Sequence, residues 1–320
     1  MRHYCTLFDL NYLARGLALH GSLLRHGGEF QLHVLCLDEA TRKALSSLSL
    51  ARVELISIDG LERWDSELKS VRPGRRPAEF YFTCKPVLLG YLLERYPDAQ
   101  RLTYLDSDLF FFSDAASAEL EFADSPIALS PHRFSPQNAD RAQYGQFNAG
   151  WISVSPRSDG RRFVDWWRGR CMEWCSLTVE DTRFGDQKYL DQVPELFPGT
   201  AIASEAINLG PWNLDPRVVE LTDGHVMVAG RRLAVYHFHA IQRMLFGLYE
   251  CGLHEYRVEF TREVKEGIYR PYIRELAACE RQAAALSSVP IVPPGPVGFA
   301  RRLKGTARAF IRQSVIFGMP

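Results

Sequence analysis

The sequence predicts an α/β fold with a mixed central sheet flanked by helices, and three observations support it. The first hundred residues alternate between strand-like and helix-like segments, as in a parallel sheet with helical crossovers. After residue 112 the strand-like segments are separated by loops, which predicts a mixed or antiparallel continuation of the same sheet. The 320 residues, 46% apolar and 24% charged, suit a soluble globular protein with one large domain or two small ones.

The expected elements follow from hydrophobic periodicity and from turn residues. Strands are expected over residues 3–8, 31–37, 53–58, 102–105, 109–112, 126–129, 147–154, 217–221, 225–228 and 233–238. Helices are expected over residues 12–25, 39–48, 83–95, 159–176 and 261–286, with a short helix beginning near residue 185. Asp38 is the expected N-cap of helix 39–48.

Composition excludes several classes of protein. The net charge is zero, so we expect no nucleic-acid partner. Seven scattered cysteines without a C-x-x-C pair favour reduced thiols and a cytoplasmic location. Residues 1–8 lack the apolar core of a signal peptide, and no apolar run approaches the length that spans a membrane.

The most informative segment is Tyr104-Leu-Asp-Ser-Asp-Leu-Phe-Phe-Phe112, where two carboxylates interrupt an apolar strand. Side chains alternate along an extended chain, so Asp106 and Asp108 can face the same way. Paired carboxylates repel each other unless a cation lies between them, which predicts a metal site at a strand end, although a solvated turn would give the same letters. Five other short motifs accompany this pair: Phe8-Asp-Leu-Asn-Tyr12, Lys85, Phe147-Asn-Ala-Gly-Trp151, Gly185-Asp-Gln-Lys188 and Tyr236-His-Phe-His-Ala240.

In this order and spacing, the motifs resemble those of the GT-A fold nucleotide-sugar glycosyltransferases. The pattern is closest to glycosyltransferase family 8, the retaining family of glycogenin and the bacterial lipopolysaccharide galactosyl- and glucosyltransferases. The resemblance spans about residues 4 to 245. It implies a Rossmann-like catalytic domain over 1–258, with a nucleotide-binding half at 1–112 and an acceptor half at 113–258.

The resemblance implies roles for the first motif in holding a uridine. Phe8, Asp9 and Asn11 would surround base and ribose, and Tyr12 would stack on the base, since a flat aromatic ring beside short polar groups suits a nucleobase. An ordinary strand-to-helix turn with Asn11 as N-cap explains the same residues.

The resemblance also implies a donor-sugar and diphosphate site. Lys85 would lie near the diphosphate, although Pro86 directly after it departs from the family pattern, and a solvated lysine is the simpler alternative. Asp186 would bind hydroxyls of the donor sugar, and Gln187 would lie beneath its anomeric carbon. The remaining implied contacts to the nucleotide sugar are Asp106, Ser107, Asn148, Ala149 and Arg243, with Gly150 allowing a close backbone approach.

A divalent metal is implied by the same comparison. Asp106, Asp108 and His237 would bind Mn²⁺ or Mg²⁺, and His239 is the second candidate because it has the same side-chain parity on a strand. The family usually continues with G-x-x-K-P-W. Here residues 240–244 read Ala-Ile-Gln-Arg-Met, so Arg243 would replace the phosphate-binding lysine.

The function implied is sugar transfer from a nucleotide-diphosphate sugar, expected to be a UDP-sugar, to a glycan or glycolipid with retention of configuration. An inverting enzyme remains an alternative, with Asp181, Asp186 or Glu205 as base, and so does a non-catalytic sugar-binding scaffold. A nucleotidyltransferase is disfavoured because no glycine-rich basic loop follows the first strand. The loop 208–213 could line an acceptor pocket or pack in the core.

The C-terminal part is expected to be separate from the catalytic domain. Residues 259–288 form a helical extension, and the proline-rich linker from 289 leads to a basic tail that ends at 320. Residues 299–320 contain five basic and no acidic residues, with apolar side chains that include Val315 and Phe317 at partly helical spacing. This predicts a helix at an anionic membrane surface, peripheral to the inner face of the plasma membrane, or a helix packed on the core.

Overall fold

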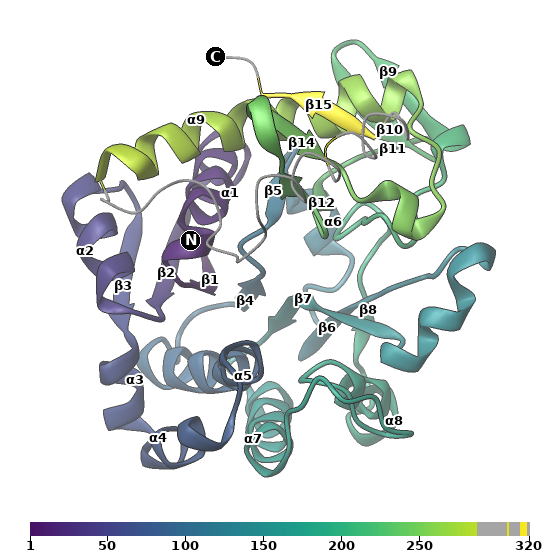
Figure 1. Cartoon of the computed structure of the whole chain (residues 1–320). Coiled ribbons are helices and arrows are strands. Elements are labelled where there is room, and N and C mark those ends of the chain that lie inside the picture. The colour runs from purple at the N-terminus through teal and green to yellow at the C-terminus, as the bar shows by residue number, and fades with distance from the viewer. Residues whose placement is uncertain (287–305, 307–313, 319–320) are drawn as a thin grey trace.

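The computed structural model describes residues 1–286, 306 and 314–318, and its centre is a seven-stranded sheet (Figure 1). The order across the sheet is β3-β2-β1-β4-β7-β6-β8. These strands are β1 Arg2–Phe8, β2 Phe30–Cys36, β3 Val53–Ser57, β4 Leu102–Leu105, β6 Ile127–Pro131, β7 Phe147–Val154 and β8 Ala201–Ile202.

The sheet is parallel in its first half and mixed in its second. β1 pairs in parallel with β2 and β4, whereas β7 runs antiparallel to both β4 and β6. The start of β7 therefore meets the carboxyl end of β4, and the Asp106 N–H donates to the Gly150 carbonyl at 2.8 Å. This confirms the predicted mixed sheet and gathers several of the motifs at one edge.

Helices cover both faces of the sheet (Figure 1). One face carries α1 Leu13–His26, α2 Glu39–Leu48 and α9 Arg270–Leu286, and α1 packs along α9. The other carries α3 Ile58–Trp64, α4 Ser66–Val71, α5 Pro77–Arg95 and α7 Ser158–Glu173. The Asp38 side chain caps α2 by accepting from the Thr41 N–H at 2.6 Å, as predicted.

A two-stranded ribbon next to the sheet joins the two halves of the chain. β5 Leu109–Phe111 pairs antiparallel with β12 Val235–His237, and His237 lies opposite Leu109. Shorter elements lie along the chain between β5 and β12. They include α6 Ala116–Leu120, α8 Val193–Leu196 and the 3₁₀ turns Pro136–Tyr144 and Lys188–Gln192.

Several expectations about elements are wrong. Strands β9 Val219–Thr222, β10 His225–Val228 and β11 Arg231–Arg232 form their own antiparallel sheet, because short hairpins pair locally without joining the central one. Helix α5 begins at Pro77 and not near residue 83, since proline suits a first helical turn. The helix expected near residue 185 is the 3₁₀ turn 188–192, and the helices α3 and α4 were not expected.

The C-terminal region is only partly described. The expected helix 261–286 is present as a π-helical turn, Val264–Tyr269, that continues into α9. Val315–Phe317 form strand β15, which pairs with β14 Leu248–Glu250 beside β13 Gln242–Arg243. The helical spacing expected for Val315 and Phe317 is therefore wrong, while most of the predicted linker and basic tail lies outside the described residues. No helix in the described part of the chain is long and apolar enough to cross a membrane.

Candidate active site

A cleft of about 830 Å³ opens where β1 and β4 end and β7 begins. Most of the residues singled out from the sequence line it: Phe8, Asp9, Tyr12, Lys85, Asp106, Ser107, Asp108, Asn148, Ala149, Asp186, Gln187, His237 and His239. Asn11 and Arg243 do not. Asn11 is exposed, and its side chain donates to Asp9 at 3.1 Å, whereas Arg243 forms an ion pair with Glu280 at 3.2 Å.

The two carboxylates of the Asp106-Ser-Asp108 (D-x-D) segment lie close to the imidazole ring of His237. His237 Nε2 lies 3.0 Å from Asp108 Oδ1 and 3.9 Å from Asp106 Oδ2. One potential ligand atom from each of the three residues lies within 4.8 Å of the others. His239 lines the same cleft but is not part of this group. The β5–β12 pairing accounts for the arrangement, because it holds His237 beside the turn that carries the aspartates.

Buried amides fix the ring orientation of His132. Its Nδ1 must donate to the Gly145 carbonyl at 3.0 Å, because a carbonyl only accepts. Nε2 then accepts from Asn148 Nδ2 at 3.2 Å. This amide orientation is the one required by the Gly150 N–H, which donates to Asn148 Oδ1 at 2.9 Å. Burial lowers the pKa of His132 to about 3, so the ring is neutral.

The same chain of hydrogen bonds continues to His237. Asn208 Nδ2 donates to Asn148 Oδ1 at 3.0 Å, so the Asn208 carbonyl oxygen faces His237 Nδ1, also at 3.0 Å. His237 Nδ1 therefore carries a hydrogen, and a neutral ring presents the Nε2 lone pair toward Asp108. A lone pair 3.0 Å from a carboxylate oxygen requires a proton or a metal ion between them.

Gly150 permits this close packing. A Cβ atom at residue 150 would lie 2.5 Å from His237 Cε1, 2.7 Å from Asn148 Oδ1 and 2.8 Å from Asp106 Oδ2. Any larger residue would displace all three groups, so the close backbone approach expected from the F-N-A-G motif is a steric requirement of the site.

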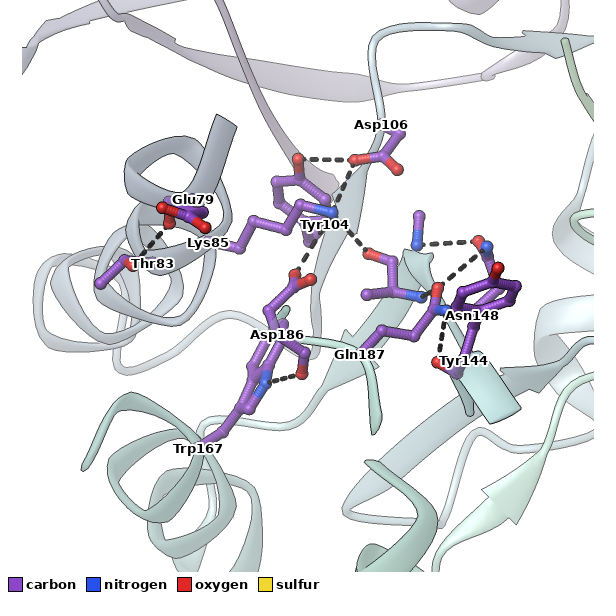
Figure 2. A network of polar contacts seen from close by, with 12 residues as sticks. Glu79, Thr83, Lys85, Tyr104, Asp106, Tyr144, Asn148, Trp167, Asp186 and Gln187 are labelled. Atoms are coloured by element: carbon purple, nitrogen blue, oxygen red, sulfur yellow. Dashed lines mark hydrogen bonds and ion pairs between the residues drawn. The ribbon is translucent and has the colours of Figure 1, made fainter. Parts of the chain in front are cut away.

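Lys85 is a buried cation between two carboxylates, as Figure 2 shows. Its Nζ lies 3.0 Å from Asp106 Oδ1 and 3.4 Å from Asp186 Oδ2. Tyr104 also donates to Asp106 Oδ1, at 2.8 Å. The alternative of a solvated lysine is wrong, because Lys85 is buried and its Nζ also donates to the Ala149 carbonyl of β7 at 3.4 Å.

Electrostatics in this group are set by burial and by mutual charge. Burial lowers the pKa of Lys85, but Asp106 and Asp186 outweigh it and hold the pKa above its ordinary value. Burial, with repulsion from Asp106, raises the pKa of Asp186 to about 6 despite the attraction of Lys85. Lys85 is therefore one cation shared by two carboxyl groups, those of Asp106 and Asp186, and Asp108 adds a third acid nearby.

Gln187 is held in one orientation (Figure 2). Its Oε1 accepts from the Ala149 N–H at 3.2 Å and from Asn148 at 3.3 Å, and its Nε2 donates to the Tyr144 carbonyl at 3.0 Å. The amide therefore connects the start of β7 with the turn 136–144. Trp167 supports the preceding residue by donating to the Asp186 carbonyl at 2.8 Å.

The β1 end of the cleft has an aromatic pair. Asp9, not Asn11, caps the turn after β1 by accepting from the N–H groups of Asn11 and Tyr12 at 3.0 and 3.3 Å. Tyr81 also donates to Asp9, at 3.2 Å, and lines the cleft with Tyr12, whose side chain is 45% exposed. An exposed ring over a polar turn is available for stacking.

Sequence reasoning missed several cleft residues. His132, Tyr81, Arg141 and Tyr256 belong to no motif, and no local signal distinguishes them from other surface or core residues. The loop 208–213 was expected either to line a pocket or to pack in the core, and it does both. Trp212 lines the cleft although it is only 3% exposed.

Comparison with solved structures confirms the GT-A fold. The crystal structure of the galactosyltransferase LgtC in complex with donor and acceptor sugar analogues superposes with a TM-score of 0.52 and 16% identity, and the alignment covers 90% of this chain and 97% of that one. At this identity the likeness establishes the fold and not the activity.

Comparison by sequence finds relatives but no matching family model. YfnF of Bacillus subtilis (strain 168) is 32% identical over 244 residues, which are 73% of this chain and 80% of YfnF. YfnD of the same organism is 30% identical over 280 residues, which are 86% of this chain and 88% of YfnD. Both relatives are described as uncharacterized proteins. The chain, a protein of GT-A fold, therefore belongs to the family of YfnF and YfnD.

Proposed function

We propose that the protein is a metal-dependent glycosyltransferase that transfers a sugar from a UDP-sugar to a glycan or glycolipid. The observation that carries the proposal is the Asp106–Asp108–His237 group, which lies in one cleft with the Lys85–Asp186 ion pair in a GT-A fold. A non-catalytic scaffold would not need carboxylates held this close together, because their repulsion costs stability.

The three side chains fit a hard divalent ion. Carboxylate oxygens with one imidazole suit Mn²⁺ or Mg²⁺, and Asn208 holds His237 with its Nε2 toward the carboxylates. When bound, such an ion would neutralise negative charge that develops on the leaving diphosphate. Asp106 would hold the ion through Oδ2, because Oδ1 already interacts with Lys85 and Tyr104.

The β1 end of the cleft would hold the nucleoside. Tyr12 offers its exposed ring to the base, and Tyr81 and Asp9 place polar groups beside it. Lys85 would keep a positive charge between the carboxylates and the diphosphate. Phe8 would close the pocket from the β1 side.

Retention of configuration is favoured over inversion by the placement of acids. Among the described residues, the carboxylates that line the cleft are Asp9, Asp106, Asp108 and Asp186. Asp186 is paired with Lys85, whereas Asp181 and Glu205 are exposed and do not line the cleft. Asp9 caps the turn at the β1 end, and Asp106 and Asp108 belong to the metal group, so the described cleft residues leave no other carboxylate as a base for inversion. Gln187 and Asp186 would instead stabilise positive charge at the reacting carbon.

Calorimetry and turnover test the proposal. Asp108→Asn should abolish Mn²⁺-dependent UDP affinity and reduce donor turnover by orders of magnitude, whereas the matched variant Asp98→Asn, at an exposed site outside the cleft, should behave as wild type. Near-normal turnover in Asp108→Asn would contradict the metal assignment. UDP binding without turnover on any nucleotide sugar would favour a scaffold, and a β-linked product from an α-linked donor, detected by NMR, would favour inversion.

A further inference from the structure

We propose that the acceptor is an anionic sugar, one that carries a carboxylate or a phosphate group, and that Arg141 binds this group. The inference rests on the proposed transferase function and deepens it. It concerns the part of the cleft on the β6 and β7 side of β4, opposite the β1 side where the nucleoside would lie. We call this part the β6-side wall, and its residues are His132, Phe134, Arg141, Tyr144, Trp212 and Tyr256.

The β6-side wall has no acidic side chain among the described residues. The four carboxylates that line the cleft belong to the turn after β1, to the metal group and to the Lys85 pair. The β6-side wall is aromatic, with Phe134 stacked on His132 at 4.5 Å and Trp212 edge-on to His132 at 5.3 Å. Aromatic faces suit the C–H surface of a sugar ring, and this wall therefore fits a sugar beside the metal group.

Arg141 is a positioned cation. Its guanidinium lies over the Tyr256 ring at 4.3 Å, and one N–H group donates to the Glu255 carbonyl at 2.8 Å. Within the described residues it forms no ion pair with a carboxylate, in contrast to Lys85. A guanidinium has five N–H donors, so several remain for a ligand in the cleft.

Trp212 adds a second donor without an acceptor. It is buried, and its indole Nε1–H has no hydrogen-bond partner among the described residues. The ring lies 5.2 Å from His237 and 6.5 Å from Tyr256, so it spans the distance between the metal group and the residue on which Arg141 rests. A buried N–H without a partner is costly unless a ligand supplies an acceptor.

The donors and acceptors of the wall favour an anion over a neutral sugar. Hydroxyl groups donate as well as accept, and neutral sugars are therefore held best where acceptor oxygens are present. Here Arg141 and Trp212 only donate, and the acceptor nitrogen of His132 is already used by Asn148. The hydroxyl groups of Tyr144 and Tyr256 donate as well as accept, so the described polar groups of the wall contain more donors than acceptors. A carboxylate or phosphate accepts several N–H bonds at once, which matches this set.

Matched pairs of sugars test the proposal. Glucose and galactose glycosides would be compared with the corresponding uronates and 6-phosphates by calorimetry, with UDP and Mg²⁺ saturating. The wild type should bind at least one anionic sugar about tenfold or more tightly than its neutral partner, the size of one charge-assisted hydrogen bond. Comparison of the affinities for the uronates and the 6-phosphates identifies which anionic group the protein binds.

Arg141→Gln should remove this preference. Arg257→Gln is the matched control, because Arg257 bridges the same two segments by donating to the Gln137 carbonyl but does not line the cleft. The control should keep the preference. Equal binding of neutral and charged sugars, absence of binding by every anionic sugar, or a preference that survives in Arg141→Gln would each overturn the proposal.

Two further outcomes would place the anion elsewhere and also overturn it. A loss of UDP affinity in Arg141→Gln would assign Arg141 to the diphosphate. A preference for nucleotide sugars with a uronate group, without one among free sugars, would assign it to the donor. Failure of the underlying function is distinguishable, because the wild type would then show no metal-dependent UDP binding and no donor turnover.

Discussion

Replacing Lys85 with Met tests how the candidate site is held together. The substitution removes the charge between Asp106 and Asp186 and leaves a linear apolar side chain. Lys85 and Asp186 are 4% and 3% exposed, so water cannot take the place of the ammonium group. Removing one partner of a buried ion pair leaves an uncompensated charge, and we expect the free energy of unfolding to fall by about 3–5 kcal/mol.

Asp186, the second partner of Lys85, should be replaceable at a lower cost. Its pKa is raised from the ordinary value of 3.8 to about 6 by burial and by Asp106, so its ionised form, which still predominates at pH 7.5, is less favourable in the folded protein than in the unfolded chain. Asp186→Asn should therefore leave stability unchanged or raise it. In the double variant Lys85→Met/Asp186→Asn, the free energy of unfolding should fall by less than half as much as in Lys85→Met alone. Only Asp106 then remains charged, and its side chain is 25% exposed.

The free energies of unfolding of the wild type, the two single variants and the double variant form a double-mutant cycle. They are measured by urea unfolding, followed by tryptophan fluorescence at pH 7.5 with EDTA. The coupling free energy between Lys85 and Asp186 should reach about 2 kcal/mol. Lys43→Met is the control, because Lys43 is 74% exposed and lies 4.0 Å from Glu39, and it should change stability by less than about 0.5 kcal/mol. Additive effects in the cycle, or a loss below about 1 kcal/mol in Lys85→Met, would refute the reasoning.

Gly150→Ala places a methyl group 2.5 Å from the His237 ring. It should weaken Mn²⁺-dependent UDP binding about 10- to 100-fold in calorimetry. Unchanged binding would mean that the site tolerates a displaced His237. Asn208→Ala removes the acceptor that orients His237 and should cost metal affinity about tenfold at least, while a far smaller effect would show that the ring needs no such support. Burial lowers the pKa of His33 to about 4, although Glu54 raises it. Below pH 6.5, the ordinary pKa of histidine, the unfolded chain therefore binds a proton at His33 that the folded protein does not bind. The free energy of unfolding consequently falls as the pH falls below 6.5. Between pH 7 and 5 this loss should be about 2 kcal/mol, and urea unfolding of His33→Gln should show a loss smaller by that amount.

The sequence alone determined the features that depend on neighbours along the chain. The alternation of segments predicted the parallel half of the sheet, and Asp38 was correctly assigned as the cap of α2. The D-x-D pair was placed at a strand end, which is where β4 stops. Hydrophobic periodicity and capping are local properties, so they can be read without knowing what packs nearby.

Tertiary structure decided the features that depend on distant segments. His237 and His239 have the same parity on a strand, and only the pairing of β12 with β5 placed His237 at 3.0 Å from Asp108. Lys85 could have been a solvated lysine, but folding buried it between Asp106 and Asp186. The charge, protonation and orientation of a buried side chain are set by groups that come from elsewhere in the chain, and the local sequence does not contain them.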